Sequence, residues 1–159
     1  MSAERIDLAA IPPTLIQFRG GCLTVLRSDL ATVSPEEGCA LLLGRRDRDL
    51  ACHVQIVWPC RNVWREASAR HRHFALDPRE QIAAQRWSRR RDFQVLAVAH
   101  SHPNSGCQPS DCDRALADRE LITVILDGMG TPSAWWLMPD TGFISVPLQV
   151  WDTDEPCGV

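Results

Sequence analysis

The residues best suited to chemistry lie close together near position 100. His100 and His102 end an apolar run, Phe93 to Ala99, that has the composition of a β-strand. Two residues apart on a strand, both imidazoles point to the same face, roughly 6.5 to 7 Å apart along the backbone. Asp113, at the start of a predicted helix, can return to that face. Two imidazoles and one carboxylate can hold one catalytic Zn²⁺ ion and leave a fourth position for water.

A hydrolytic zinc site needs two more groups beside its ligands. One is a base that takes a proton from water and returns it to the leaving amine, and Glu37, at the start of the buried strand 38–44, is the candidate. The other is a donor to the developing oxyanion, a role that the hydroxyl of Ser110 can fill. Ser110 and Asp113 also have the spacing of a helix capping box, so a structural role for this pair stays open.

Two thiols, Cys107 and Cys112, lie inside the same loop. Cys112 is next to a predicted helix N-terminus, where its pKa could be lowered, and it could then ligate the zinc or pair with Cys107. The alternative is that both are inert loop residues, as most cysteines are. We treat them as candidate regulatory thiols.

Strands and helices are interspersed along the chain. The predicted strands are 15–18, 38–44, 50–58, 71–76, 93–102, 121–126, 133–138 and 143–150, and the predicted helices are 22–33, 78–91 and 110–119. Turn residues at 45–49 and 139–142 predict hairpins. This order favours an α/β or α+β layered domain with a single mixed β-sheet flanked by helices, spanning residues 14–151. Residues 1–13 are expected to be a flexible lead and 152–159 a frayed tail.

Composition limits the classes of function. A chain of 159 residues with a net charge of -3 fits one domain, and with no long basic run it lacks the electrostatic footprint of a nucleic-acid-binding protein. The sequence shows neither a secretory signal nor an apolar run long enough to span a membrane. Seven cysteines without regular spacing favour reduced thiols and a cytoplasmic location. The composition leaves the oligomeric state undetermined.

Three parts of the sequence together resemble the motif of the JAMM (MPN+) zinc metallopeptidases. They are Glu37 followed seven residues later by Gly44, the run His100-Ser101-His102-Pro103, and Ser110-x-x-Asp113. The resemblance extends through Pro59 to Asn62 and His73 to Pro78, and so covers roughly residues 15–150. It implies an MPN/JAMM-like (cytidine-deaminase-like) architecture with zinc bound by the two histidines and Asp113. It also implies that Glu37 is the general base and that Ser110 supports the tetrahedral intermediate.

The same resemblance implies a class of substrate. The family cleaves peptide or isopeptide bonds after the C-terminal tail of ubiquitin or ubiquitin-like proteins, and its short bacterial-type members act on sulfur carrier proteins that end in Gly-Gly. Such a tail would bind as an extended strand added to a sheet edge. The segment between Gly44 and His100 has no large insertion of the kind that grips a second ubiquitin, which favours a compact processing peptidase.

Three other classes of function can be compared with this sequence. Zinc deaminases need His-x-Glu and Pro-Cys-x-x-Cys motifs, and neither occurs in this sequence. A non-catalytic zinc-containing module that binds ubiquitin-like tails stays open. A DNA-repair-associated JAMM-like protein is a further alternative, disfavoured by the absence of a basic face.

Overall fold

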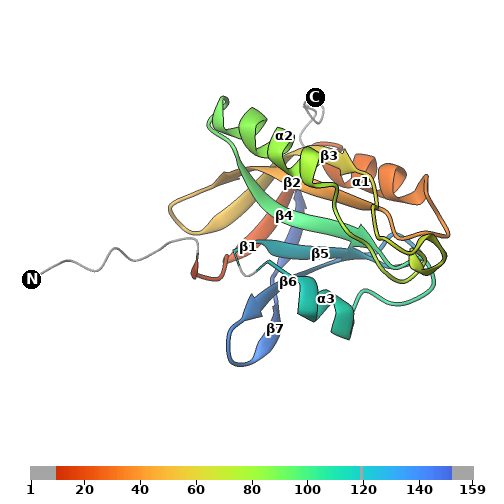
Figure 1. Cartoon of the computed structure of the whole chain (residues 1–159). Helices are drawn as coiled ribbons and strands as arrows, with labels where there is room; N and C mark the ends of the chain where they lie inside the picture. Colours follow the sequence, from red (N-terminus) through yellow and green to blue (C-terminus); the bar gives the residue numbers. More distant parts are fainter. Residues whose placement is uncertain (1–9, 119, 152–159) are drawn as a thin grey trace, which may run out of the picture.

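The fold is built on one mixed β-sheet, as the order of strands and helices predicted (Figure 1). The computed structural model describes residues 10–118 and 120–151. The predicted frayed tail at 152–159 and most of the predicted flexible lead, residues 1–9, lie outside the described residues. Within the described part, the elements are β1 (Leu15–Arg19), α1 (Cys22–Ala31), β2 (Cys39–Arg46), β3 (Ala51–Cys60), α2 (Pro78–Arg89), β4 (Gln94–Ser101), α3 (Asp111–Leu116), β5 (Ile122–Leu126), β6 (Pro132–Met138), β7 (Gly142–Ser145) and β8 (Leu148–Trp151), with a 3₁₀ turn at Ala67–Ala69.

The sheet has the strand order β7-β6-β5-β4-β2-β3-β1-β8. The apolar strand β2 lies near its middle and pairs antiparallel with both β3 and β4, so its side chains are buried on both faces. This confirms the expectation for a continuous apolar run. Parallel pairs join β4 to β5 and β1 to both β3 and β8, which makes the sheet mixed.

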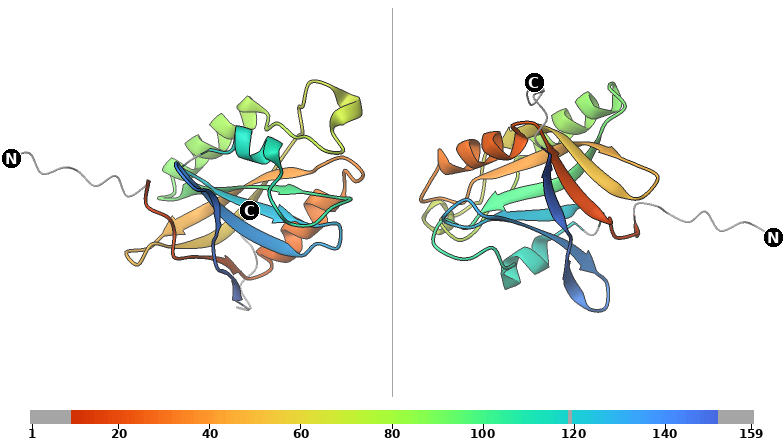
Figure 2. Two further views of the ribbon diagram at one scale, coloured as in Figure 1. Left: turned by 90° about the horizontal axis from the view of Figure 1, so that it is seen from below. Right: turned by 180° about the vertical axis from the view of Figure 1, so that it is seen from behind.

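The helices cover the two faces of the sheet unequally. Figure 2 shows α1 on one face, while α2 and α3 lie on the other. The larger core fills the face under α1 and includes Phe18 and Leu26, which are fully buried. A smaller core under α2 includes Leu41 and Leu43 from β2. The second face therefore has less apolar cover, and the predicted functional residues lie there.

Gly44 allows the middle of the sheet to form. A Cβ atom at this position would lie 1.9 Å from the carbonyl oxygen of His53 on β3, far inside van der Waals contact. The β2–β3 register also shifts between Leu43 and Gly44. Only glycine permits so close an approach of two backbones.

The predicted last strand, 143–150, is in fact two strands. Residues 142–145 form β7 and pair with β6, whereas residues 148–151 form β8 and pair with β1 at the other end of the sheet. The chain changes partner at Val146 and Pro147, where proline has no N–H to give to a ladder. The prediction was wrong here because the pattern of apolar residues does not reveal a change of partner.

Two further expectations were wrong. Residues 71–76 were predicted as a strand, but they form a turn and an irregular stretch with one isolated bridge between Asn62 and Leu76. The helix predicted to reach Arg119 ends at Leu116, because Ala117 has an extended backbone with ψ 136°. The start of α2 was predicted correctly, since Asp77 caps it by accepting a hydrogen bond from the N–H of Arg79.

Candidate metal centre

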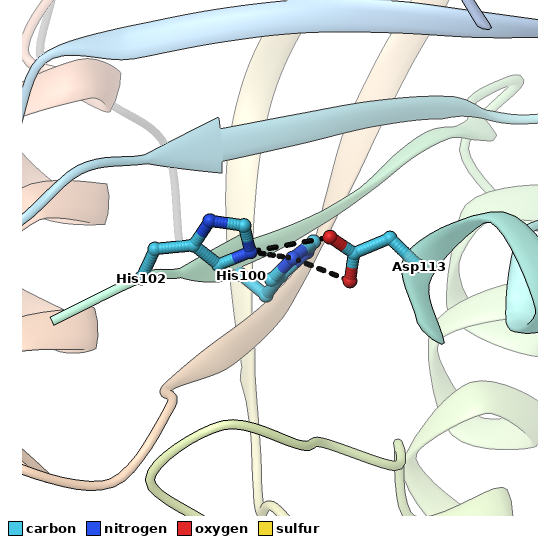
Figure 3. A group of neighbouring side chains, drawn as sticks. All are labelled: His100, His102 and Asp113. Atoms are coloured by element: carbon cyan, nitrogen blue, oxygen red, sulfur yellow. Dashed lines mark hydrogen bonds and ion pairs between the residues drawn. The ribbon is translucent and has the colours of Figure 1, made fainter. Parts of the chain in front are cut away.

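The two histidines come from the carboxyl end of β4. His100 lies in the strand, opposite Cys39 of β2 and Ile125 of β5. His102 lies just beyond the strand, and its N–H donates to the carbonyl oxygen of Leu126 at 2.8 Å. Figure 3 shows the imidazole rings of both histidines and the carboxylate of Asp113, from α3, pointing toward one another. Residues from two separate elements thus converge as the spacing predicted.

The separations of the three side chains fit a tetrahedral metal ion. The Nε2 atoms of His100 and His102 are 3.0 Å apart. The carboxylate oxygens of Asp113 lie 3.0 Å from Nε2 of His100 and 3.2 Å from Nε2 of His102. Ligand atoms about 2.0 to 2.1 Å from Zn²⁺ at a tetrahedral angle are about 3.3 Å apart, so the observed spacing is close to what the ion requires. All three residues are buried.

The rings of the two histidines are oriented in different ways. Nδ1 of His102 lies 2.8 Å from the carbonyl oxygen of Gly106, which can only accept, so Nδ1 carries the proton and Nε2 keeps a lone pair for a metal. Nδ1 of His100 is buried and has no hydrogen-bond partner among the described residues. Its ring instead stacks on Phe74, with centroids 4.3 Å apart and an interplanar angle of 21°.

Ser110 and Asp113 form the capping box of α3. The hydroxyl oxygen of Ser110 accepts a hydrogen bond from the N–H of Asp113 at 3.0 Å, and the N–H of Ser110 donates to the Asp113 carboxylate at 2.7 Å. The capping box, which was the alternative structural role for Ser110 and Asp113, is therefore present. It does not exclude a chemical role, because the hydroxyl proton of Ser110 is still free to donate.

The charges of the cluster suit a cation. Burial alone would raise the pKa of Asp113, but hydrogen bonds with His100 and His102 hold that pKa well below its usual range. Complete burial lowers the pKa of His100, which favours the neutral ring that a metal needs. For His102, burial also acts to lower the pKa, but the hydrogen bonds to Asp113 and Gly106 outweigh it and raise the value.

Glu37 lies beside this cluster, at the point where the chain enters β2. Glu37 is only 5% exposed. Burial raises the pKa of the Glu37 carboxyl from 4.5 to about 7, and the charge of His102 lowers it while that of Asp113 raises it. A bound cation would shift this pKa downward, toward the carboxylate. Glu37 is not one of the three clustered residues.

The loop that carries Cys107 is fixed to β6, whereas Cys112 lies in the first turn of α3. The carbonyl oxygen of Cys107 accepts hydrogen bonds from the hydroxyl of Ser133 at 2.6 Å and from Nε1 of Trp135 at 3.1 Å. Both cysteines are free thiols, and neither belongs to the three-residue cluster. Burial raises the pKa of Cys112, the opposite direction to the lowering considered for a thiol at a helix N-terminus. Whether these thiols regulate the site stays a prediction.

A pocket of about 360 Å³ adjoins the cluster, and His100 and Asp113 form part of its wall. It lies on the second face of the sheet, bounded by β4, β5, α2 and α3. Most of its lining is apolar and includes Leu41, Phe74, Leu76, Val95, Val98 and Leu116. A chain segment bound there would lie directly beside the metal ligands.

Two residues near the site were missed as functional residues. The hydroxyl of Ser101 accepts a hydrogen bond from the N–H of Gly38 at 2.8 Å, and the N–H of Ser101 donates to the carbonyl oxygen of Gly38 at 3.0 Å. The side chain of Asn62 donates to the carbonyl oxygen of Glu37 at 3.0 Å. Both residues lie inside the stretches that carried the family resemblance, but only the folded chain reveals what they contact.

The fold and site together define an α+β domain built around a candidate metal centre. A family model described as prokaryotic homologs of the JAB domain matches residues 21–138, and the chain belongs to this family. The predicted relationship to JAMM proteins is thereby confirmed. Among the described residues, no helix combines the length and apolar character needed to cross a membrane.

Similar proteins come from bacteria and from a phage. Tail tip assembly protein K of Escherichia phage N15 is 30% identical over 105 residues, which are 66% of this chain and 37% of the phage protein. The chain therefore spans little more than a third of that relative. A solution structure of a Desulfitobacterium hafniense protein matches with a TM-score of 0.77 at 28% identity, covering 87% of this chain and 94% of that one. A Salinibacter ruber protein matches with a TM-score of 0.61 at 28% identity, covering 84% and 90%.

Proposed function

We propose that this protein is a zinc-dependent metallopeptidase that hydrolyses a peptide or isopeptide bond after the C-terminal Gly-Gly tail of a ubiquitin-like or sulfur carrier protein. The observation that carries the proposal is the convergence of two imidazoles and one carboxylate at zinc-like spacing, with Glu37 buried beside them. Membership of the JAB-domain family supports it.

The ligands would be Nε2 of His100, Nε2 of His102 and the carboxylate of Asp113. When bound, Zn²⁺ supplies Lewis acidity, which lowers the pKa of a water molecule and polarises the scissile carbonyl. The carbonyl of Gly106 holds the tautomer of His102, and the N–H of Ser110 orients the carboxylate of Asp113. Such partners of metal ligands typically change metal affinity or activity by about 10 to 100-fold.

Glu37 would act as the general base. Its carboxylate takes one proton from the attacking water and delivers it to the amine as the C–N bond breaks, so that the products are a free carboxylate and a free amine. The hydroxyl proton of Ser110 would be donated to the oxyanion that develops on the scissile carbonyl. The oxygen of the same hydroxyl accepts a hydrogen bond from the N–H of Asp113, which keeps it in place.

The pocket beside the ligands supports a protein tail as substrate. Its wall includes two zinc-ligand candidates at one end and Val95 of β4 at the other, so an extended segment of several residues could lie along it. Glycine residues next to the scissile bond would let the backbone approach ligands as deeply buried as His100.

A substitution at Glu37 tests this function. Purified protein should contain about one zinc per chain, and Glu37→Gln should keep that zinc while slowing hydrolysis by about 10² to 10⁴-fold. The substrate is a sulfur carrier protein whose Gly-Gly terminus is extended by a short peptide, and cleavage is followed by mass spectrometry. The matched control is Glu36→Gln, which makes the same change one residue earlier and should keep full activity.

Hydrolysis at the wild-type rate by Glu37→Gln would refute the general-base assignment. A protein that contains zinc but turns over no Gly-Gly-extended substrate would instead favour a second candidate, a zinc-containing module that binds such tails without cleaving them. The observation that favours this second candidate is the similarity to tail tip assembly protein K, whose name describes assembly. Binding of the extended carrier protein, measured by calorimetry with no cleavage product, would support it.

A further inference from the structure

The segment between β3 and α2 covers Glu37 although it contains little regular structure. Its described elements are the 3₁₀ turn at Ala67–Ala69 and the isolated bridge between Asn62 and Leu76. The N–H of Glu37 donates to the carbonyl oxygen of Arg70, in this segment, at 2.7 Å. The backbone of the proposed base is therefore held by an irregular loop as well as by the sheet.

The side chain of Asn62 is the centre of that loop. Its Nδ2 donates to the carbonyl oxygens of Glu37 at 3.0 Å and His73 at 2.9 Å. Its Oδ1 accepts from the N–H groups of Trp64 at 3.0 Å and Ala75 at 3.2 Å. A primary amide has two donor hydrogens and two acceptor lone pairs, so all of its hydrogen-bonding capacity is used, and every partner is a backbone group.

These bonds pair both backbone polar groups of Glu37. Its N–H is bound by Arg70 and its carbonyl by Asn62, whereas the next residue, Gly38, is bound on both sides by Ser101 of β4. Glu37 thus lies just before the chain enters β2, where it contacts the loop. Among the described residues, no other donor bonds to the carbonyl of Glu37, so without the Asn62 amide this buried carbonyl would be unpaired. The backbone that carries the Glu37 carboxylate would then be less firmly held.

The same amide also acts on the metal side of the site. Nδ2 of Asn62 binds the carbonyl of His73, and the next residue, Phe74, stacks on the ring of His100. Because Nδ1 of His100 has no hydrogen-bond partner among the described residues, the ring is oriented by this stacking contact together with the contacts of its Nε2 with His102 and Asp113. One side chain therefore connects the backbone of Glu37 to the support of a metal ligand.

We propose that Asn62 is a positioning residue that sets the place of Glu37 relative to the metal centre. It does so by donating from one nitrogen to both Glu37 and His73. The proposal rests on the function proposed above for Glu37. It assigns to Asn62 no contact with substrate or with the reacting atoms.

Asn62→Asp tests the donor half of this arrangement. The carboxylate keeps one oxygen to accept from Trp64 and Ala75, but its second oxygen faces the carbonyls of Glu37 and His73 and repels them. We expect kcat to fall at least 10-fold, KM to change less than 3-fold, and zinc content to stay at the wild-type value. Gln149→Glu, an amide-to-carboxylate change on the exposed strand β8, is the matched control and should leave kcat unchanged.

Hydrogen exchange of the metal-free protein supplies a readout independent of activity. In Asn62→Asp, the amide of Glu37 should exchange at least 10-fold faster, while the amides of Leu41 to Leu43 in β2 keep their protection. Should the variant fail to fold, Asn62→Ser replaces it. The shorter serine side chain cannot reach the carbonyls of Glu37 and His73 and adds no charge, so the same results are expected. Unchanged exchange at Glu37, or faster exchange spread evenly through β2, would overturn the proposal.

Failure of this proposal can be told apart from failure of the proposed function. If the wild type hydrolyses nothing, or Glu37→Gln keeps full activity, the function proposed for Glu37 is wrong, and exchange at Glu37 still decides whether Asn62 holds it. If Glu37→Gln is inactive while Asn62→Asp keeps kcat, the function stands and the positioning role is wrong.

Discussion

Ser110 is the residue for which a structural and a chemical role can be separated most sharply. Its hydroxyl oxygen accepts the N–H of Asp113 at 3.0 Å as the cap of α3, and its hydroxyl proton is proposed to donate to the oxyanion. Replacing a serine cap by alanine costs about 1 kcal/mol. For a chain of this size that lowers Tm by about 2 to 4 °C.

This loss of stability cannot by itself reduce activity. A domain of about 5 to 15 kcal/mol stability stays almost fully folded after losing about 1 kcal/mol. Loss of one oxyanion donor, in contrast, typically lowers kcat by about 10² to 10³-fold. We therefore expect Ser110→Ala to lower Tm slightly, keep its zinc and lose at least 10²-fold in kcat.

The matched control is the cap of α2. Asp77 accepts a hydrogen bond from the N–H of Arg79 at 2.9 Å, so Asp77→Ala removes the same kind of cap at a different helix. It should lose a similar amount of stability and keep its kcat. The assays are thermal unfolding, zinc content and cleavage of the extended carrier protein. If Ser110→Ala keeps kcat within about 3-fold of wild type, or loses activity only by losing zinc, the hydroxyl has no direct role in the reaction.

Two further predictions concern the β2–β3 hairpin. Gly44→Ala would place a Cβ 1.9 Å from the carbonyl of His53, and separating the strands should cost more than about 3 kcal/mol, measured by denaturant unfolding; wild-type stability would show that the backbones are not so close. A hydrogen bond from His53 at 2.7 Å lowers the pKa of Asp47. Its stabilising effect is thus present above the unfolded pKa of about 3.9 and is lost as pH falls through the lower folded value. Asp47→Asn should therefore be less stable than wild type at pH about 6, and the difference should shrink as pH falls below about 3.9. A difference as large at pH about 2 as at pH about 6 would contradict this.

Much of the candidate site could be predicted because its signals are local. His100 and His102 follow a strand-like run, and the spacing of Ser110 and Asp113 is that of a cap, so short-range backbone geometry brings each pair together. The start of α2 has the same origin, since Asp77 and Pro78 favour a helix start whatever lies around them.

The errors occurred where a partner in space decides the structure. Residues 143–150 have the composition of one strand, but β7 pairs with β6 and β8 with β1, so the chain must break between them. Residues 74–76 have apolar side chains suited to a strand, but Phe74 stacks on His100, and the backbone groups of His73 and Ala75 bond to the side chain of Asn62.

The sequence by itself determined the chemistry available to this protein: a donor set for one metal ion, a helix cap that presents the acid, and an apolar strand with Glu37 at its start. Only the tertiary structure decided where Glu37 lies, because that depends on the antiparallel pairing of β2 with β4 and on bonds between Gly38 and Ser101, 63 residues apart. It also decided which residues support the site. An apolar pattern shows which face of a strand is buried, but the identity of the neighbouring strand, and of loops such as the one around Asn62, follows from how the whole chain packs.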